Sequence, residues 1–250
     1  MSAKKSYRYE IEAQDIDFRR KVSLSSLTNF VLITAGRNAE ENGFGLLELQ
    51  NCNFTWVLSR LVIDMERMPD ESDSLTIDTW IEKIGTTFTN RNFRLFSAAG
   101  EVIGHAASSW AVIDMDTRRS VLLDTLPGMQ RFVVDESTPI GEPGRIDHIE
   151  GEVSNQFQVK YSDIDINSHA NSLNYVQWLS DCFSLDYYSG HHIRRFEINF
   201  LKEIMFGDSG QVYRQEKAAG DHYFQIVTRD KGVACRARIL FGELPHVSIA

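Results

Sequence analysis

The hydrophobic positions of this chain follow a helical period in two places. Both stretches place apolar side chains on one face of a helix, and the second has the full i, i+3, i+4, i+7, i+8 spacing of an amphipathic helix. The first stretch contains Leu27, Phe30, Val31 and Thr34, and the second contains Tyr175, Trp178, Leu179, Cys182 and Phe183. The sequence therefore predicts one amphipathic helix in each half of the chain.

Most of the remaining chain alternates between apolar and polar positions, as a strand does when one face is buried. Leu75, Ile77 and Thr79 illustrate this period of two, and turn residues such as Gly100 and Gly220 separate the runs. The predicted strands are Tyr7–Ile16, Leu46–Gln50, Thr55–Met65, Ser74–Ile84, Phe88–Ser97, Glu101–Asp114, Val153–Tyr161, Ile193–Ile204, Ser209–Lys217, His222–Thr228 and Val233–Phe241.

The two halves repeat the same order of elements. Each starts with a strand, continues through an Asp-Ile-Asp turn (Asp15–Asp17 and Asp163–Asp165) into the helix, and ends in several strands. Between them, Pro139–Gly151 is polar and rich in Pro and Gly, which is typical of a linker. The pattern predicts an α+β protein with two related domains, 1–138 and 152–250, joined by a linker at 139–151.

Composition narrows the class of protein. The chain has 250 residues, of which 42% are hydrophobic, and a formal net charge of −9. This acidity argues against general binding to nucleic acid or to anionic membranes. No run approaches the roughly 20 apolar residues of a membrane span, and the N-terminus lacks the apolar core of a signal peptide. The three cysteines are scattered, so a reducing, cytoplasmic location is expected.

Candidate chemistry is concentrated just before the second helix. Asp163, Asp165, Asn167, His169 and Asn171 occupy every second position there. Carboxylate, amide and imidazole groups crowd together at a helix N-terminus, which favours an oxyanion or a polarised carbonyl. On spacing alone, a capped helix preceded by a solvated loop explains the same residues.

This segment resembles the signature of the acyl-acyl-carrier-protein (acyl-ACP) thioesterases of plants and bacteria, D-x-D-x-N-x-H-x-N-N followed by Y and W. Ser172 stands where the family commonly has a second Asn. Thr55–Arg60, Arg67–Pro69, Asp78–Trp80 and Asp116–Arg119 also match family text in order, so the resemblance covers nearly the whole chain. It implies a tandem (double) hotdog fold, in which each hotdog is a curled antiparallel sheet around a long central helix.

The resemblance also implies catalytic residues: Asp165, Asn167, His169 and, on a following strand, Glu203. Glu203 or Asp165 would deprotonate a water molecule that Asn167 and His169 orient. Some plant members have a cysteine directly after the acid, but here that residue is Ile204, which disfavours a thiol nucleophile. No metal or cofactor is implied.

Further residues are expected to bind substrate. The family places the acyl chain in the first hotdog, where Trp56 and Trp80 could line it, and the backbone around Asn171 would polarise the thioester carbonyl. The carrier protein is acidic, so basic residues are candidates for docking it: Arg194, Arg195, Lys202, Arg236 and Arg238.

The function that follows is hydrolysis of fatty acyl-ACP to free fatty acid and carrier protein in fatty acid biosynthesis. The partner is then acyl carrier protein bearing acyl-phosphopantetheine, and the enzyme is a monomer or homodimer. Two alternatives remain open: a hotdog thioesterase that acts on acyl-CoA, and a non-catalytic acyl-binding hotdog protein. The first repeat keeps Asp15 and Asp17 but lacks the Asn-x-His text, so we expect it to be catalytically inactive.

Overall fold

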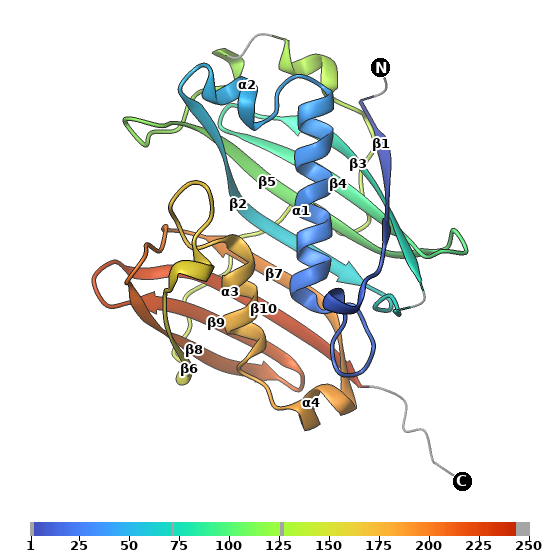
Figure 1. The fold of residues 1–250 in the computed structure, drawn as a ribbon, viewed down its shortest axis with the longest axis vertical. Coiled ribbons are helices and arrows are strands. Elements are labelled where there is room, and N and C mark those ends of the chain that lie inside the picture. Colours follow the sequence, from blue (N-terminus) through green and yellow to red (C-terminus); the bar gives the residue numbers. More distant parts are fainter. Residues whose placement is uncertain (1–2, 72, 126–127, 244–250) are drawn as a thin grey trace. The chain divides into compact units, whose positions relative to one another are not determined.

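The computed structural model describes residues 3–71, 73–125 and 128–243, which form two compact units (Figure 1). Unit 1 comprises Met1–Asp64 and Pro69–Gly144, and unit 2 comprises Met65–Met68 and Arg145–Ala250. The division between Gly144 and Arg145 falls inside the predicted linker, whereas Met65–Met68, which the prediction places in the first domain, groups with unit 2. No helix of the described part is long and apolar enough to cross a membrane.

Unit 1 consists of an antiparallel sheet and a long helix. Its strands lie in the order β1-β3-β4-β5-β2, and their bounds are β1 Lys5–Glu10, β2 Phe54–Met65, β3 Ser74–Ile84, β4 Phe88–Phe96 and β5 Val102–Asp114. Apart from β1, which ends before Ile16, these strands confirm the predicted ones within one residue at each end.

Helix α1 (Leu24–Glu41) covers one face of this sheet. Ser23 is the N-cap of this helix, and its hydroxyl accepts a hydrogen bond from the N–H of Ser26 at 3.1 Å. Its apolar stripe is buried against the sheet, and two polar contacts add to that packing. The Tyr9 hydroxyl lies 2.7 Å from Thr34 Oγ1, and Arg91 Nη1 donates to Asn38 Oδ1 at 2.7 Å. The sheet face that carries Tyr9 and Arg91 is therefore the inner face of unit 1.

The predicted strand at Leu46–Gln50 is wrong, because this segment is the short helix α2. Five residues fit either period, and the burial decides between them: Leu49 is buried while Leu47 is exposed. The carboxylate of Glu40 accepts a hydrogen bond from the N–H of Leu46 at 2.9 Å, which satisfies one of the donors at the start of the helix.

Unit 2 repeats this design on a smaller scale. Its antiparallel sheet has the order β7-β10-β9-β8-β6, and the strand bounds are β6 Glu152–Gln158, β7 His191–Phe200, β8 Ser209–Ala218, β9 Asp221–Thr228 and β10 Gly232–Glu243. Helix α3 (Ser172–Ser180) packs on the sheet, and the indole of Trp178 stacks on Phe157 of β6 with ring centroids 3.8 Å apart.

Helix α3 is shorter than its apolar stripe. It ends at Ser180, so Cys182 and Phe183 follow it in a turn that leads to helix α4 (Leu185–Gly190). Phe183 packs edge-on against Phe224 and Phe241 instead of continuing the helix face. Phe183 continues the helical spacing in the sequence, but in the structure it belongs to an aromatic cluster at the end of α3.

The second part of the linker is folded onto unit 2. Ile146 and Ile149 are buried, although the segment reads as polar. Asn199 Oδ1 accepts from the N–H of Ile146 at 2.8 Å, and Gln225 Nε2 donates to the carbonyl of Ile149 at 3.2 Å. Residues 145–151 are thus part of unit 2.

Candidate active site

The loop before α3 is a tight turn that the side chain of Asp165 holds together. Asp165 Oδ1 accepts hydrogen bonds from the backbone N–H groups of Asn167 at 2.8 Å and His169 at 3.4 Å. The backbone N–H of Asp165 donates to the carbonyl of His169 at 2.9 Å, which closes the turn. Ser168 takes a left-handed φ of 65° at its tip. Asp165 therefore shapes the loop that presents Asn167 and His169.

A second segment brings the predicted acid to this loop. The N–H of Ala170 donates to the carbonyl of Ile204 at 2.7 Å, and His169 forms a bridge with Met205. This pairing places His169 Nε2 3.2 Å from Glu203 Oε2. Both side chains retain solvent access, as a water-dependent reaction requires. The expected position of Glu203 on a strand is wrong, because β7 ends at Phe200 and Glu203 lies in the loop that follows.

The hydroxyl of Tyr175 anchors the loop that carries Glu203. The position of Tyr175 in an apolar helix stripe does not predict this role. Its hydroxyl donates to the carbonyl of Lys202 at 3.3 Å, next to Glu203. Burial raises the pKa of the phenol above its usual value, so it stays protonated and a donor. The only signal in the sequence is a polar hydroxyl on an otherwise hydrophobic helix face.

Tyr175→Phe is expected to lower kcat several-fold with KM little changed, because the loop that carries Glu203 loses an anchor. The lost hydrogen bond should also reduce the free energy of unfolding by about 1 kcal/mol. Steady-state kinetics and urea denaturation measure the two effects. Tyr213→Phe is the matched control, since its hydroxyl donates to a side chain of the same strand, Gln211 Oε1, at 2.9 Å. An equal fall in kcat for both variants would contradict the positioning role.

Several of the backbone donors expected around Asn171 are already engaged. The N–H of Asn171 donates to the carbonyl of Asp163 at 2.8 Å, and the Asn171 side chain caps α3 by accepting from Leu173 N–H at 3.0 Å. The N–H of Ser168 donates to the carbonyl of Asp165 at 3.0 Å. Asn171 is therefore the N-cap of α3, and its own N–H does not face a substrate. The side-chain amide of Asn167, which is exposed at the turn, is the better placed donor for an oxyanion.

The first half of the chain contains the same turn. The N–H of Ser23 donates to the carbonyl of Asp15 at 2.9 Å, as that of Asn171 does to Asp163, and Arg20 has a left-handed φ of 62° like that of Ser168. The N–H of Val22 donates to the carbonyl of Pro69 at 2.9 Å, equivalent to the bond from Ala170 to Ile204. These matched bonds give a residue-by-residue correspondence between the two turns.

That correspondence shows what the first turn lacks. Arg19 stands where unit 2 has Asn167, Lys21 stands where it has His169, and Met68 stands where it has Glu203. Arg19 Nη2 pairs with Asp17 Oδ2 at 2.6 Å, and Lys21 pairs with Asp70. Ion pairs therefore occupy this turn in place of the His169–Glu203 pair, and its inactivity stays a prediction.

The two tryptophans predicted to bind substrate lie in different surroundings. Trp56 donates its indole N–H to the carbonyl of Phe44 at 2.9 Å and packs against a buried cluster that includes α1. Trp80 is fully buried on the opposite, outer face of the sheet, where its N–H donates to the carbonyl of Glu136. A residue on that face does not line a space between α1 and the sheet, so only Trp56 fits the predicted role.

Arg194 and Arg195 lie near the start of β7, at the other end of this strand from Glu203. Arg194 is exposed, whereas Arg195 Nε pairs with Glu197 Oε1 at 2.8 Å. The structure does not bring them to the loop of His169, and their contribution to docking stays a prediction.

The cysteines of unit 2 are poorly suited to nucleophilic chemistry. Cys182 and Cys235 are both buried, and burial raises the pKa of each thiol. The thiol of Cys182 donates to the backbone carbonyl of Trp178 at 3.4 Å rather than to an imidazole. These surroundings agree with the interpretation that water, rather than a thiolate, attacks the substrate.

Comparison with known proteins identifies the fold and the family. The model of the acyl-ACP thioesterase N-terminal domain matches residues 3–125, and that of the C-terminal domain matches residues 146–243. An acyl-ACP thioesterase structure from Bacteroides thetaiotaomicron has a TM-score of 0.91 and 33% identity, covering 96% of this chain and 98% of that one. The 12:0-ACP thioesterase of Umbellularia californica has a TM-score of 0.86 and 19% identity, covering 98% and 99% of the two chains.

Curated relatives are more distant in sequence. A chloroplastic palmitoyl-acyl carrier protein thioesterase of Gossypium hirsutum is 24% identical over 212 residues, which cover 79% of this chain and 51% of the relative. A dodecanoyl-[acyl-carrier-protein] hydrolase of Umbellularia californica is 23% identical over 212 residues, which cover 78% and 55%. The chain thus spans about half the length of the curated relatives it matches.

The fold and the site together define a tandem hotdog protein with a histidine–glutamate pair in its second hotdog. The chain belongs to the acyl-ACP thioesterase family.

Proposed function

We propose that this protein hydrolyses fatty acyl-ACP to free fatty acid and carrier protein, as a step of fatty acid biosynthesis. The observation that carries this proposal is the contact of 3.2 Å between His169 Nε2 and Glu203 Oε2 on a turn that Asp165 holds in place. Membership of the family supports the same reaction. A non-catalytic acyl-binding protein has no need of this pair.

The first step is the attack of water on the thioester. His169 Nε2–H donates to Glu203 Oε2 and orients the carboxylate, which takes a proton from water. The water oxygen then forms a bond to the carbonyl carbon, and the carbonyl electrons move onto the oxygen. Asp165 is a weaker candidate for the base, because its Oδ1 already accepts two backbone N–H groups of the turn.

The second step is the collapse of the tetrahedral intermediate. The side-chain amide of Asn167 donates to the oxyanion until the C–S bond breaks. The sulfur leaves with the bonding electrons and takes the proton that Glu203 holds, so the thiol of the phosphopantetheine arm and the free acid are released. A single well-placed oxyanion donor contributes about 10²–10³-fold to the rate, which suffices for an ester already activated by sulfur.

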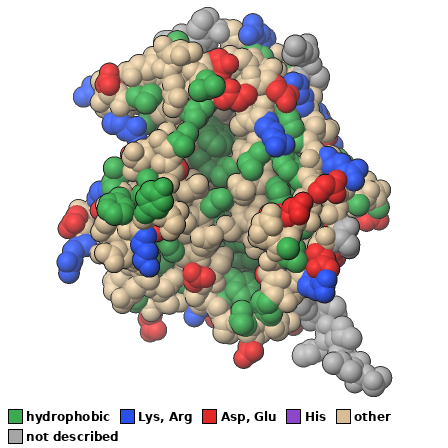
Figure 2. Space-filling view, in the orientation of Figure 1, with side chains coloured by type: hydrophobic (Ala, Val, Ile, Leu, Met, Phe, Trp, Pro, Cys, Tyr) green, Lys and Arg blue, Asp and Glu red, His purple; other side chains and the backbone are tan. Residues whose placement is uncertain are grey.

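Unit 1 would hold the acyl chain. Figure 2 shows hydrophobic side chains in a hollow beside α1, over the sheet of this unit. Trp56 packs against the buried clusters around Phe44 and Leu49, so it belongs to the apolar interior of this unit. Burial of each additional methylene would favour binding by about 0.8 kcal/mol, which is enough to select chain length.

A ladder of acyl-ACPs and matching acyl-CoAs, assayed with the purified protein, tests the proposal. We expect a higher kcat/KM with acyl-ACP than with the acyl-CoA of the same chain length. Equal or better turnover of acyl-CoA would support the acyl-CoA thioesterase alternative. Binding of both thioesters without release of thiol would support a non-catalytic acyl-binding protein.

Two further parts of the proposal concern location and assembly. The curated relatives are named as chloroplastic proteins, whereas we propose a cytoplasmic location for this chain. We also propose a monomer or a homodimer, because the tandem repeat already supplies two hotdogs. Cell fractionation and analytical ultracentrifugation measure these properties directly.

A further inference from the structure

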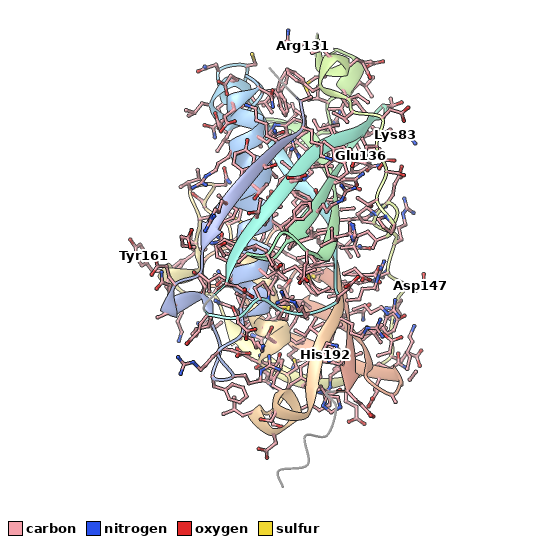
Figure 3. All side chains as sticks on the ribbon, turned by 90° about the vertical axis from the view of Figure 1, so that its right-hand side faces the viewer. Lys83, Arg131, Glu136, Asp147, Tyr161 and His192 are labelled. Atoms are coloured by element: carbon pink, nitrogen blue, oxygen red, sulfur yellow. The ribbon has the colours of Figure 1, made fainter. Side chains whose placement is uncertain are left out.

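Large hydrophobic side chains are exposed around the His169–Glu203 pair. Tyr161 is 89% exposed, Ile166 is 83% exposed and Phe206 is 68% exposed. Figure 3 shows Tyr161 extending away from the ribbon, and Figure 2 shows hydrophobic side chains protruding where Figure 1 draws the loop before α3. We call Tyr161, Ile166 and Phe206 the apolar rim. Three such residues on one small surface are unusual unless the surface binds a partner.

The rim is one surface because backbone hydrogen bonds join the loops that carry it. The N–H of Val159 donates to the carbonyl of Asp208 at 2.8 Å, and the N–H of Gly207 donates to the carbonyl of Val159 at 3.3 Å. These bonds set Tyr161 beside the turn that carries Phe206. Ile166 lies on the adjoining turn, between Asp165 and Asn167.

The inactive turn of unit 1 provides an internal control. By the correspondence of hydrogen bonds described above, Ala13 is equivalent to Tyr161, Phe18 to Ile166 and Glu71 to Phe206. The copy without catalytic residues therefore keeps one of the three apolar side chains and has an alanine and a glutamate at the other two places. The full rim occurs with the catalytic pair, which indicates a role in the reaction rather than in folding the turn.

The charges at the rim suit an acidic partner. Lys160 and Lys202 are exposed, in a chain whose net charge is −9. Two neighbouring acids are engaged within the loops: Asp163 Oδ2 accepts from the N–H of Lys160 at 2.7 Å, and Asp208 Oδ2 accepts from Met205 N–H and Lys231 Nζ, both at 2.8 Å. Lys160 and Lys202 therefore add two exposed positive charges beside the rim, next to the partly exposed carboxylate of Glu203.

We propose that the apolar rim, with Lys160 and Lys202, is the surface on which the protein part of acyl carrier protein docks. The inference rests on the proposed function and specifies where its partner binds. Lysines next to exposed aromatic and aliphatic groups complement an acidic protein that must bring its thioester to Glu203. A second copy of this chain fits less well, because a symmetric contact would set the lysines of both copies against each other.

The double variant Ile166→Ser with Phe206→Ser tests the rim. We expect the KM for acyl-ACP to rise by about tenfold or more, because central apolar side chains carry most of an interface's binding energy. Turnover of the matching acyl-CoA, which has the same thioester and pantetheine arm but no protein, shows whether the catalytic turn is intact and should change little. Phe18→Ser, the equivalent change in the inactive turn, should affect neither substrate.

The double variant Lys160→Glu with Lys202→Glu tests the charges. We expect a higher KM for acyl-ACP and the loss of its dependence on salt, since charge steering is screened over about 8–10 Å near physiological ionic strength. Arg194→Glu with Arg195→Glu, at the other end of β7, is the comparison. A larger effect from the arginine pair would move the docking surface there and overturn the proposal.

The outcomes separate this inference from the proposed function. If the wild-type protein shows no preference for acyl-ACP over acyl-CoA, the proposed function fails. If the preference exists but the rim variants keep it, only the docking surface is wrong. Equal losses on both substrates would place Ile166 and Phe206 in the catalytic centre and overturn the inference. A change of sedimentation from dimer to monomer in the rim variant would instead assign the rim to self-association.

Discussion

Glu203→Gln is expected to lower kcat for acyl-ACP by about 10²–10⁴-fold, with little change in KM, because the amide cannot accept the proton of water. The carboxamide has nearly the same shape as the carboxylate and can still contact His169, so the loop should keep its fold. Single-turnover hydrolysis of acyl-ACP, together with the melting temperature, measures both expectations. The interaction of 3.2 Å between Glu203 and His169 is the physical basis of this prediction.

The partner residue provides the internal check. His169→Gln should also lower kcat strongly, and the double variant should be hardly slower than Glu203→Gln alone, because the two side chains act as a unit. Cys182→Ser is the control and should leave kcat largely intact, since this thiol is buried in the core of unit 2. Additive losses from the two catalytic substitutions would show that Glu203 and His169 work independently. Loss of activity in Cys182→Ser with normal folding would contradict attack by water.

The strands were largely predictable because their period of two reflects burial on one face, which the local sequence records directly. Segments that fit both a helical and a strand period could not be predicted. Leu46–Gln50 is one of them, because five residues are too few to distinguish a strand from the helix α2 that they form. The end of α3 was missed for another reason. Phe183 continues the helical spacing, but its aromatic partners come from β9 and β10, which lie far along the sequence.

The signature indicates which residues form the site, whereas their arrangement in space could not be predicted from it. Nothing local indicates that Glu203 lies beyond the end of β7, because the bond from Ala170 to Ile204 that sets its place joins distant segments. The face of the sheet on which Trp80 lies could not be predicted either, because the alternation along β3 does not show which face α1 covers. The exposed rim was not predicted either, since the exposure of Phe206 depends on how the turn from Met205 to Asp208 folds back.

Substitutions of Asp165 can distinguish a role in positioning the loop from a role in proton transfer. Its Oδ1 accepts the N–H groups of Asn167 and His169, and this requires an acceptor oxygen but no negative charge. The carboxamide oxygen of an asparagine can accept the same two bonds. Asp165→Asn is therefore expected to keep kcat within about tenfold of the wild type, whereas Asp165→Ala should lower it by about 10²-fold, because a misplaced catalytic group is that costly.

Kinetics on the two variants must be paired with a readout of loop structure. Hydrogen exchange at the amides of Asn167 and His169 should remain slow in Asp165→Asn and become fast in Asp165→Ala, since only the alanine variant loses the acceptor. Asp17→Ala removes the equivalent carboxylate from the inactive turn and should loosen that turn without changing kcat. If Asp165→Asn were as inactive as Glu203→Gln while its amides stayed protected, charge at Asp165 would be needed for the chemistry. The proton of water would then pass to Asp165, and Glu203 would serve to orient His169.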